Sequence, residues 1–191
     1  MIVREQQADD YEAIRHVYAE AFRRPRFRRP QNPGSVPPEV GLFEALWEAG
    51  EAVPELSFTA LKEVGAVGHV TASRATVATD PVVAVGPIGV LPEYQGLGIG
   101  TALMDALLTG ADAADVPMIV LLGSPQYYSR FGFRPAQESR RDISGAELGR
   151  GFSSSTSERV HPRLSGTVPI RASVLVLVAS GDIPGRWRTQ E

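Results

Sequence analysis

The sequence predicts one domain of the α+β (mixed α/β) class, in which helices flank a mostly antiparallel sheet. Three observations lead to this class. Apolar residues recur at helical spacing over residues 14–22, an extended-chain pattern occupies residues 56–90, and a glycine-rich turn then leads into a second helical pattern and a further apolar run. A chain of 191 residues with 43% hydrophobic residues can bury a sizeable core in one domain.

Two helices are expected near the N-terminus. Asp9, followed three residues later by Glu12, predicts a capping box at the start of the first helix. Its apolar face is formed by Ile14, Val17, Tyr18, Ala21 and Phe22. A second, short helix is expected over residues 40–49, ended by Gly50 in the left-handed conformation. The arginine- and proline-rich residues 23–38 between them predict a loop.

The central part of the chain predicts a meander of strands over residues 56–61, 67–77 and 82–90. Gly86-Pro87 interrupts the third strand, and because proline cannot donate to a ladder, a bulge or an end of regular pairing is expected there. A helix over about residues 98–111 and a buried strand over residues 118–122 complete a strand-helix-strand crossover.

The C-terminal part is less regular. Ser124-Pro125 predicts a short helix that ends before Gly132. A last strand over residues 168–179 needs a partner in the same sheet. We therefore expect a single domain over residues 1–180, which includes a long polar loop over residues 136–166, and a C-terminal tail over residues 181–191.

Composition excludes several classes of function. A formal net charge of -3 gives no basic field for nucleic acid. The absence of cysteine excludes disulfides, thiolate zinc sites and a cysteine nucleophile, and the three histidines have no ligand spacing, so no metal is expected. The longest apolar run, residues 174–179, is too short to cross a bilayer. We expect a cytoplasmic protein that binds neither nucleic acid nor membrane, and sheet edges left by short strands favour a homodimer.

The glycine-rich loop of residues 95–100, QGLGIG, is the most informative segment. Three glycines at alternate positions before a helix let backbone amides converge on an anion. A P-loop would need a lysine after Gly100, where Thr101 stands, and a dinucleotide fingerprint would place its third glycine at that same position. The glycines alone leave open a phosphate-binding turn or a tight turn without a ligand.

Residues 90–100, VLPEYQGLGIG, resemble the acetyl-CoA signature of GNAT N-acetyltransferases, a Gln/Arg-x-x-Gly-x-Gly/Ala loop after a strand that ends in Val-x-Pro. Residues 127–133 are similar to the Tyr-x-x-x-Gly-Phe pattern of that family, at the expected separation. Residues 122–133 also resemble the bacterial YhbS-like branch, with Ser124 in place of its usual aspartate. The resemblance covers residues 1 to about 135.

This resemblance implies the GNAT acyl-CoA N-acyltransferase fold, whose sheet splays open between the strand of residues 82–90 and that of residues 118–122. Acetyl-CoA is then the co-substrate, with its pantetheine in that gap. Main-chain groups of Ile88 and Val90 would hold the pantetheine, and the Val90 amide would polarise the thioester carbonyl. The residues implied in pyrophosphate binding are Gln95, Gly96, Leu97, Gly98, Ile99, Gly100 and Thr101.

Acyl transfer from a thioester to an amine needs an unprotonated amine and a proton for the leaving thiolate. Tyr128 is the candidate proton donor, because a phenol stays protonated at neutral pH; a core aromatic is the alternative interpretation. Glu93 and His69 are candidates for the base, and neither is favoured over a solvated turn residue or a satisfied strand residue. The five arginines of residues 23–29 predict either an anion-recruiting loop or a solvated one.

The leading hypothesis is an N-acetyltransferase that moves the acetyl group directly from acetyl-CoA to a primary amine of a small molecule in a ternary complex. A non-catalytic acyl-CoA-binding or regulatory module and a protein or peptide N-acetyltransferase are the alternatives.

Overall fold

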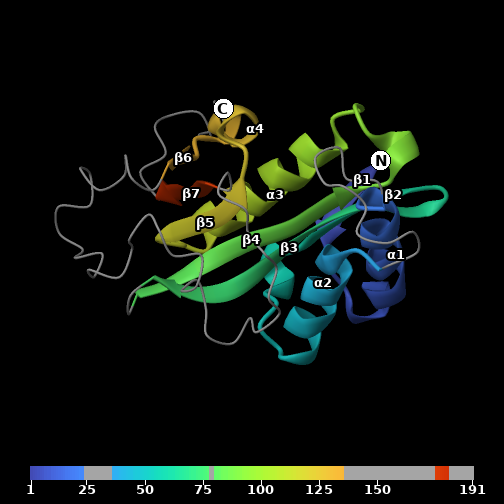
Figure 1. Ribbon diagram of the computed structural model, residues 1–191, viewed down its shortest axis with the longest axis horizontal. Helices are drawn as coiled ribbons and strands as arrows, with labels where there is room; N and C mark the ends of the chain where they lie inside the picture. The colour runs from blue at the N-terminus through green and yellow to red at the C-terminus, as the bar shows by residue number, and fades with distance from the viewer. Residues whose placement is uncertain (24–35, 78–79, 136–174, 181–191) are drawn as a thin grey trace. The chain divides into compact units, whose positions relative to one another are not determined.

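The computed structural model describes residues 1–23, 36–77, 80–135 and 175–180 (Figure 1). Contacts divide the chain into two compact units, and each unit is built from two stretches of sequence. The first unit contains residues 1–73 and 86–111, and the second contains residues 74–85 and 112–191. Strands β3 (Gly65–Val77) and β4 (Asp80–Val90) contribute residues to both units.

The first unit begins with a short strand and two helices, β1 (Ile2–Glu5), α1 (Tyr11–Ala21) and α2 (Pro38–Glu48). Helix α1 buries Ile14, Val17 and Tyr18, as its apolar spacing predicted. Ile14 and Tyr18 form one core cluster with Val40 and Phe43 of α2, and the rings of Tyr18 and Phe43 lie 5.5 Å apart. Just past α2, Gly50 has a φ of +66°, which confirms the predicted left-handed residue at its end.

The start of α1 differs from the predicted capping box. No side chain caps the helix at Asp10, and the carboxylate that reaches back is that of Asp10, which accepts a hydrogen bond of 2.9 Å from the Gln7 amide. The 3-10 turn η1 (Ala8–Asp10) starts the helical segment two residues earlier than the sequence pattern indicated, so Asp10 takes the place expected of Glu12. Asp10 is therefore the acidic residue whose carboxylate caps the start of this helical segment.

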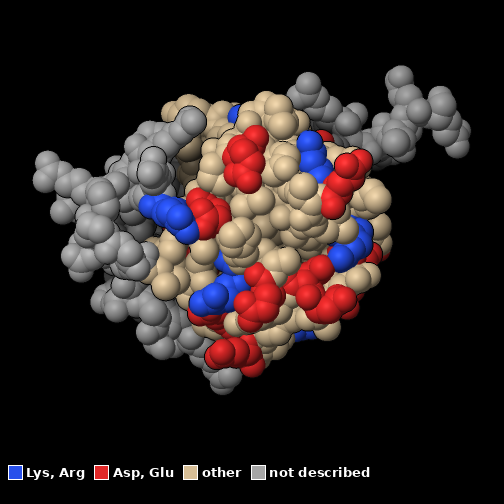
Figure 2. All heavy atoms as spheres, turned by 90° about the vertical axis from the view of Figure 1, so that its right-hand side faces the viewer, with Lys and Arg blue, Asp and Glu red and all other residues tan. Residues whose placement is uncertain are grey.

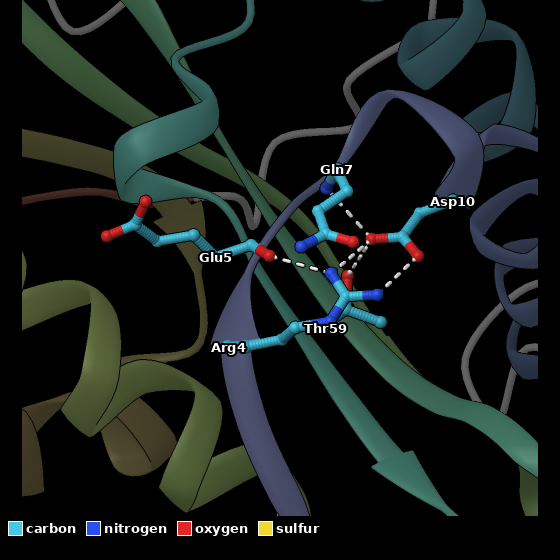
Figure 3. Close-up of polar contacts among 5 residues, drawn as sticks. All are labelled: Arg4, Glu5, Gln7, Asp10 and Thr59. Atoms are coloured by element: carbon cyan, nitrogen blue, oxygen red, sulfur yellow. Dashed lines mark hydrogen bonds and ion pairs between the residues drawn. The ribbon is translucent and has the colours of Figure 1, made fainter.

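A polar cluster surrounds the Asp10 carboxylate (Figure 3). Arg4 of β1 donates to both carboxylate oxygens, at 2.7 and 2.8 Å, and Thr59 lies at 3.3 Å. Arg4 also donates to the Glu5 carbonyl at 2.8 Å. The cluster joins β1, η1 and the second strand of the sheet, and it buries Asp10 to 8% exposure.

The sheet of the first unit starts with β1, which pairs antiparallel with β2 (Phe58–Lys62) in the register Ile2↔Leu61. Strand β2 pairs antiparallel with β3, with a shift of register between Ala60 and Leu61, and β4 is the next strand in the order. The predicted strand at residues 56–61 begins two residues later than expected, because η2 (Pro54–Leu56) places Leu56 in a 3-10 turn.

The crossover after β4 confirms the predicted sequence of elements. A 3-10 turn, η3 (Pro92–Tyr94), precedes the glycine loop, and α3 (Ile99–Ala113) follows it. The apolar face of α3 is buried through Ile99, Leu103, Met104, Leu107, Leu108 and Ala111.

The second unit is organised by β5 (Met118–Gly123), which pairs parallel with β4 and antiparallel with β7 (Leu175–Ser180). The pairing of β5 with β4 ends at Val85, directly before the cis peptide Gly86-Pro87, as the proline predicted. The short strand β6 (Arg134–Pro135) also pairs with β7.

Two short helical elements follow β5 in the second unit. These are α4 (Pro125–Tyr128), which Ser124 precedes, and the 3-10 turn η4 (Ser129–Phe131). Gly132 ends them with a φ of +83°, which confirms the predicted end of the helix. Phe131 and Phe133 are buried on either side of this glycine.

Some predictions fall outside the described residues. These are the greater part of the arginine-rich loop, at residues 24–35, the polar loop of residues 136–166, the first part of the last strand, at residues 168–174, and the tail of residues 181–191. The described part of the last strand has the sheet partner that was expected. A single domain over residues 1–180 stays a prediction.

The surface agrees with the small net charge. On the face shown in Figure 2, basic side chains lie among acidic ones without a basic patch. Of the helices that the structure describes, none has the length and apolar character needed to cross a membrane. Within the described ranges, no group of three or more His, Cys, Asp or Glu side chains comes together as a metal site.

Candidate functional site

The glycine loop of residues 95–100 has the geometry of an anion-binding turn. Gly96 and Gly98 have φ values of +79° and +80°, which residues with a side chain rarely adopt. A Cβ atom at either position would meet no atom within 4 Å outside the two adjacent residues, and both glycines are exposed, so glycine is required by the backbone conformation and not by lack of space. Helix α3 starts at Ile99, directly after these turns, and the first amides of a helix have no partner within it. The loop therefore presents backbone donors to an exposed surface.

The end of strand β4 is tied to this loop through Gln95. The Gln95 side-chain amide donates to the Val90 carbonyl at 3.0 Å, and its backbone amide donates to the Pro92 carbonyl at 3.3 Å. Gln95 thus shapes the turn, and backbone donors for an anion are expected from Gly96 onward. The first unit contains all the residues that the resemblance assigned to the cofactor, from Ile88 and Val90 to Thr101.

Tyr128 lies in the second unit, at the end of α4. Its ring packs edge-on against Tyr127 and Phe133, at centroid distances of 4.8 and 5.9 Å. Burial, with a smaller contribution from Tyr127, raises the pKa of Tyr128 to about 12. The phenol is therefore fully protonated at neutral pH, as a proton donor must be.

The two candidate bases have very different environments. His69 is fully buried in β3, its Nδ1 lies 2.6 Å from the Tyr18 hydroxyl, and burial lowers its pKa to about 3. This favours a neutral, structural strand residue over a base that exchanges protons with an acceptor. Glu93, in η3, is exposed.

The sequence profile of the Acetyltransferase (GNAT) family matches residues 11–133, which is well over half of the chain. The chain belongs to this family. The match ends close to residue 135, where the resemblance based on the two motifs also ended, and it confirms that resemblance.

Individual GNAT proteins support the same conclusion. A GNAT family acetyltransferase from Brucella melitensis, solved in complex with acetyl-CoA, is 30% identical, with a TM-score of 0.61 over 70% of this chain and 82% of that chain. The GNAT protein YhbS from Escherichia coli, solved with CoA, shares the fold at 24% identity and a TM-score of 0.61, over 72% of this chain and 70% of that chain. These similarities confirm the predicted GNAT fold.

An uncharacterized N-acetyltransferase from Escherichia coli K12, YjhQ, is 36% identical over 101 residues. The match covers 51% of this GNAT chain and 56% of that relative, so it spans only about half the length of each protein.

Two residues that were not predicted from the sequence as part of the site contact predicted candidate residues. Tyr18 hydrogen bonds to His69 and packs on β4, and Gly123 at the end of β5 lies against the Tyr128 ring. Only a weak indication of each contact was present in the sequence. A tyrosine on a buried helix face needs a hydrogen-bond partner for its hydroxyl, and a glycine in a strand often marks a place where another group packs close to the backbone.

Proposed function

We propose that this protein is an acetyl-CoA-dependent N-acetyltransferase that transfers the acetyl group directly to a primary amine of a small molecule in a ternary complex. The observation that carries the proposal is the open glycine loop, with left-handed Gly96 and Gly98 and the start of α3 directly behind it. Family membership and the neighbour solved with acetyl-CoA support this choice of anion.

The residues present fit coenzyme A. Backbone amides from Gly96 to Thr101 would hold the pyrophosphate, since the two left-handed glycines are exposed. Main-chain groups of Ile88 and Val90 would hold the pantetheine. Bound acetyl-CoA supplies the thioester, which the amine converts to an amide while CoA leaves as a thiolate.

Tyr128 is the proposed donor of the proton that the leaving thiolate takes. With its pKa raised to about 12 the phenol is protonated at neutral pH, and the surrounding aromatic rings restrict its position. The phenolate that remains after the transfer takes up a proton from solvent. The amine nitrogen must lose a proton in the same reaction, and that proton passes to solvent rather than to the buried His69.

The first experiment tests binding and turnover separately. Thermal shift with acetyl-CoA, longer acyl-CoAs and NAD should show stabilisation by CoA esters alone. A panel of small amines, with a peptide and a protein acceptor as further arms, is then assayed for release of free thiol. Failure of every CoA ester to bind would overturn the proposal, and binding without turnover on any acceptor would favour a non-catalytic module.

The second experiment tests Tyr128. Tyr128→Phe should lower kcat by about 10²-fold or more, the usual range for loss of a general acid, while CoA binding stays unchanged. Tyr127→Phe is the matched control, because it removes a neighbouring hydroxyl from the same aromatic cluster. Equal turnover in wild type and Tyr128→Phe would show that Tyr128 is not the proton donor.

A further inference from the structure

The Tyr18 hydroxyl of α1 is the centre of a buried polar network in the first unit. It lies 2.6 Å from His69 Nδ1, 2.8 Å from Thr71 Oγ1 and 2.8 Å from the Pro87 carbonyl oxygen. Tyr18, His69 and Thr71 each have 0% exposure. One helix and two strands therefore meet at one oxygen, and one of the strands is β4, just before Ile88.

The protons of this network can be assigned by counting donors. A carbonyl oxygen only accepts, so the Tyr18 hydroxyl must give its single proton to Pro87. The other two partners must then donate to the phenol oxygen, Thr71 from its hydroxyl and His69 from Nδ1. Nε2 of His69 is left without a proton, which agrees with its being a buried nitrogen that has no hydrogen-bond partner.

The Tyr18 ring makes a second contact with β4. A Cβ at Gly89 would lie 2.9 Å from the Tyr18 ring and 3.2 Å from Ala21 Cβ, so α1 lies directly on the strand backbone there. Such close packing leaves the strand little room to move. Tyr18 thus holds β4 at two points, Pro87 through its hydroxyl and Gly89 through its ring.

We propose that Tyr18 is a positioning residue for coenzyme A binding, which fixes the main chain of β4 on both sides of Ile88 so that this segment can receive the pantetheine. This inference rests on the proposed function, because Ile88 and Val90 are the residues that would bind the pantetheine. Gln95 holds the Val90 carbonyl at the other end of the segment.

The expected effect on binding depends on how often β4 has the main-chain arrangement that can bind the pantetheine. When the binding-competent arrangement is populated only a fraction of the time, the apparent Kd rises by the inverse of that fraction. Tyr18→Phe keeps the ring but removes the donor to Pro87 and the acceptor for two other groups. If the competent arrangement falls to about one tenth, the Kd for CoA rises about tenfold.

The matched control is Thr71→Val, a change of similar shape that removes another buried hydrogen bond from the same hydroxyl but leaves the bond from Tyr18 to Pro87. Both variants are compared with wild type by calorimetric titration with CoA, at a temperature where all three are folded. Tyr18→Phe should weaken binding about tenfold and raise KM for acetyl-CoA more than it lowers kcat, while Thr71→Val should lose stability without a change in Kd.

Equal Kd values for Tyr18→Phe and wild type would overturn the inference, and so would an equal loss of affinity in Thr71→Val. Wild type that does not bind CoA at all would instead contradict the proposed function.

A spectroscopic test on the wild-type protein does not depend on any variant that fails to fold. In protein labelled with ¹⁵N-histidine, long-range proton-nitrogen correlations should show His69 as a neutral imidazole with its proton on Nδ1. A proton on Nε2 would overturn the inference, because Tyr18 would then donate to His69 and leave the Pro87 carbonyl without its donor.

Discussion

Replacement of Asp10 by asparagine should destabilise the protein by about 2 kcal/mol at neutral pH, because hydrogen bonds to a charged group contribute about 1.5–3 kcal/mol each and solvent near the pair offsets part of this. The Arg4 side chain is 27% exposed and that of Asp10 is 10% exposed, so the pair lies between the surface and buried cases. For a chain of this size, that loss lowers Tm by about 4–8 °C.

The pH dependence of this loss has a definite sign. Burial alone would raise the pKa of Asp10, but the hydrogen bonds from Arg4, the Gln7 amide and Thr59, with the charge of Arg4, leave it below its usual value. A carboxyl with a lowered pKa in the folded state contributes stability above its unfolded pKa of about 3.9. That contribution is lost as the pH falls through the folded pKa. The stability gap between wild type and Asp10→Asn should therefore be full at pH 7 and shrink below about pH 4.

Urea denaturation of both proteins across this pH range measures the gap directly. A double-mutant cycle with Arg4→Met should give a coupling energy of about 1–2 kcal/mol, which assigns the effect to the Arg4–Asp10 pair. A gap that is as large at pH 3 as at pH 7, or a coupling energy near zero, would refute this reasoning.

Three further predictions concern the proposed site. Gly98→Ala forces a side chain to a φ of +80° and should weaken CoA binding. Gly41→Ala, in an exposed position of α2 with open space around it, is the control and should bind CoA like wild type. Equal affinities of Gly98→Ala and wild type in isothermal titration would contradict the role of the loop conformation. Gly123→Ala places a Cβ that overlaps the Tyr128 ring, within 2.7 Å of its Cδ2. The displaced ring should lower kcat as Tyr128→Phe does, while CoA binding is kept. An unchanged kcat would show that the position of the Tyr128 ring is not needed. Because the pKa of Tyr128 is raised to about 12, its proton is present below that pH, so kcat should not fall as pH rises to about 10; a fall near that pH in wild type that Tyr128→Phe removes would contradict the raised pKa.

The sequence predicted the parts of the fold that depend on local patterns. Apolar spacing placed the buried faces of α1 and α3, glycines marked the ends of α2 and α4, and Pro87 marked the end of the pairing between β4 and β5. The glycine loop could be predicted for the same reason, because each of its left-handed positions is marked by a glycine in the sequence. The assignment of that loop to coenzyme A depended on the family resemblance as well.

The parts that could not be predicted depend on contacts between distant residues. The partners of the Tyr18 hydroxyl are 51, 53 and 69 residues away along the chain, so helical periodicity identified Tyr18 only as a core residue. At the start of α1, the capping box was predicted at Asp9 and Glu12, but the 3-10 turn before the helix places Gln7 and Asp10 in these two positions.

The position of β5 between its two partners has a consequence for synthesis on the ribosome. Its parallel partner β4 is made before it, but its antiparallel partner β7 begins only at Leu175, after residues 124–174 have been added. At about 5–20 residues per second, this takes roughly 3–10 s. During that interval the apolar strand Met118–Gly123 has one open edge, which can pair with another nascent chain. Slower translation of this stretch should therefore increase aggregation of the newly made protein.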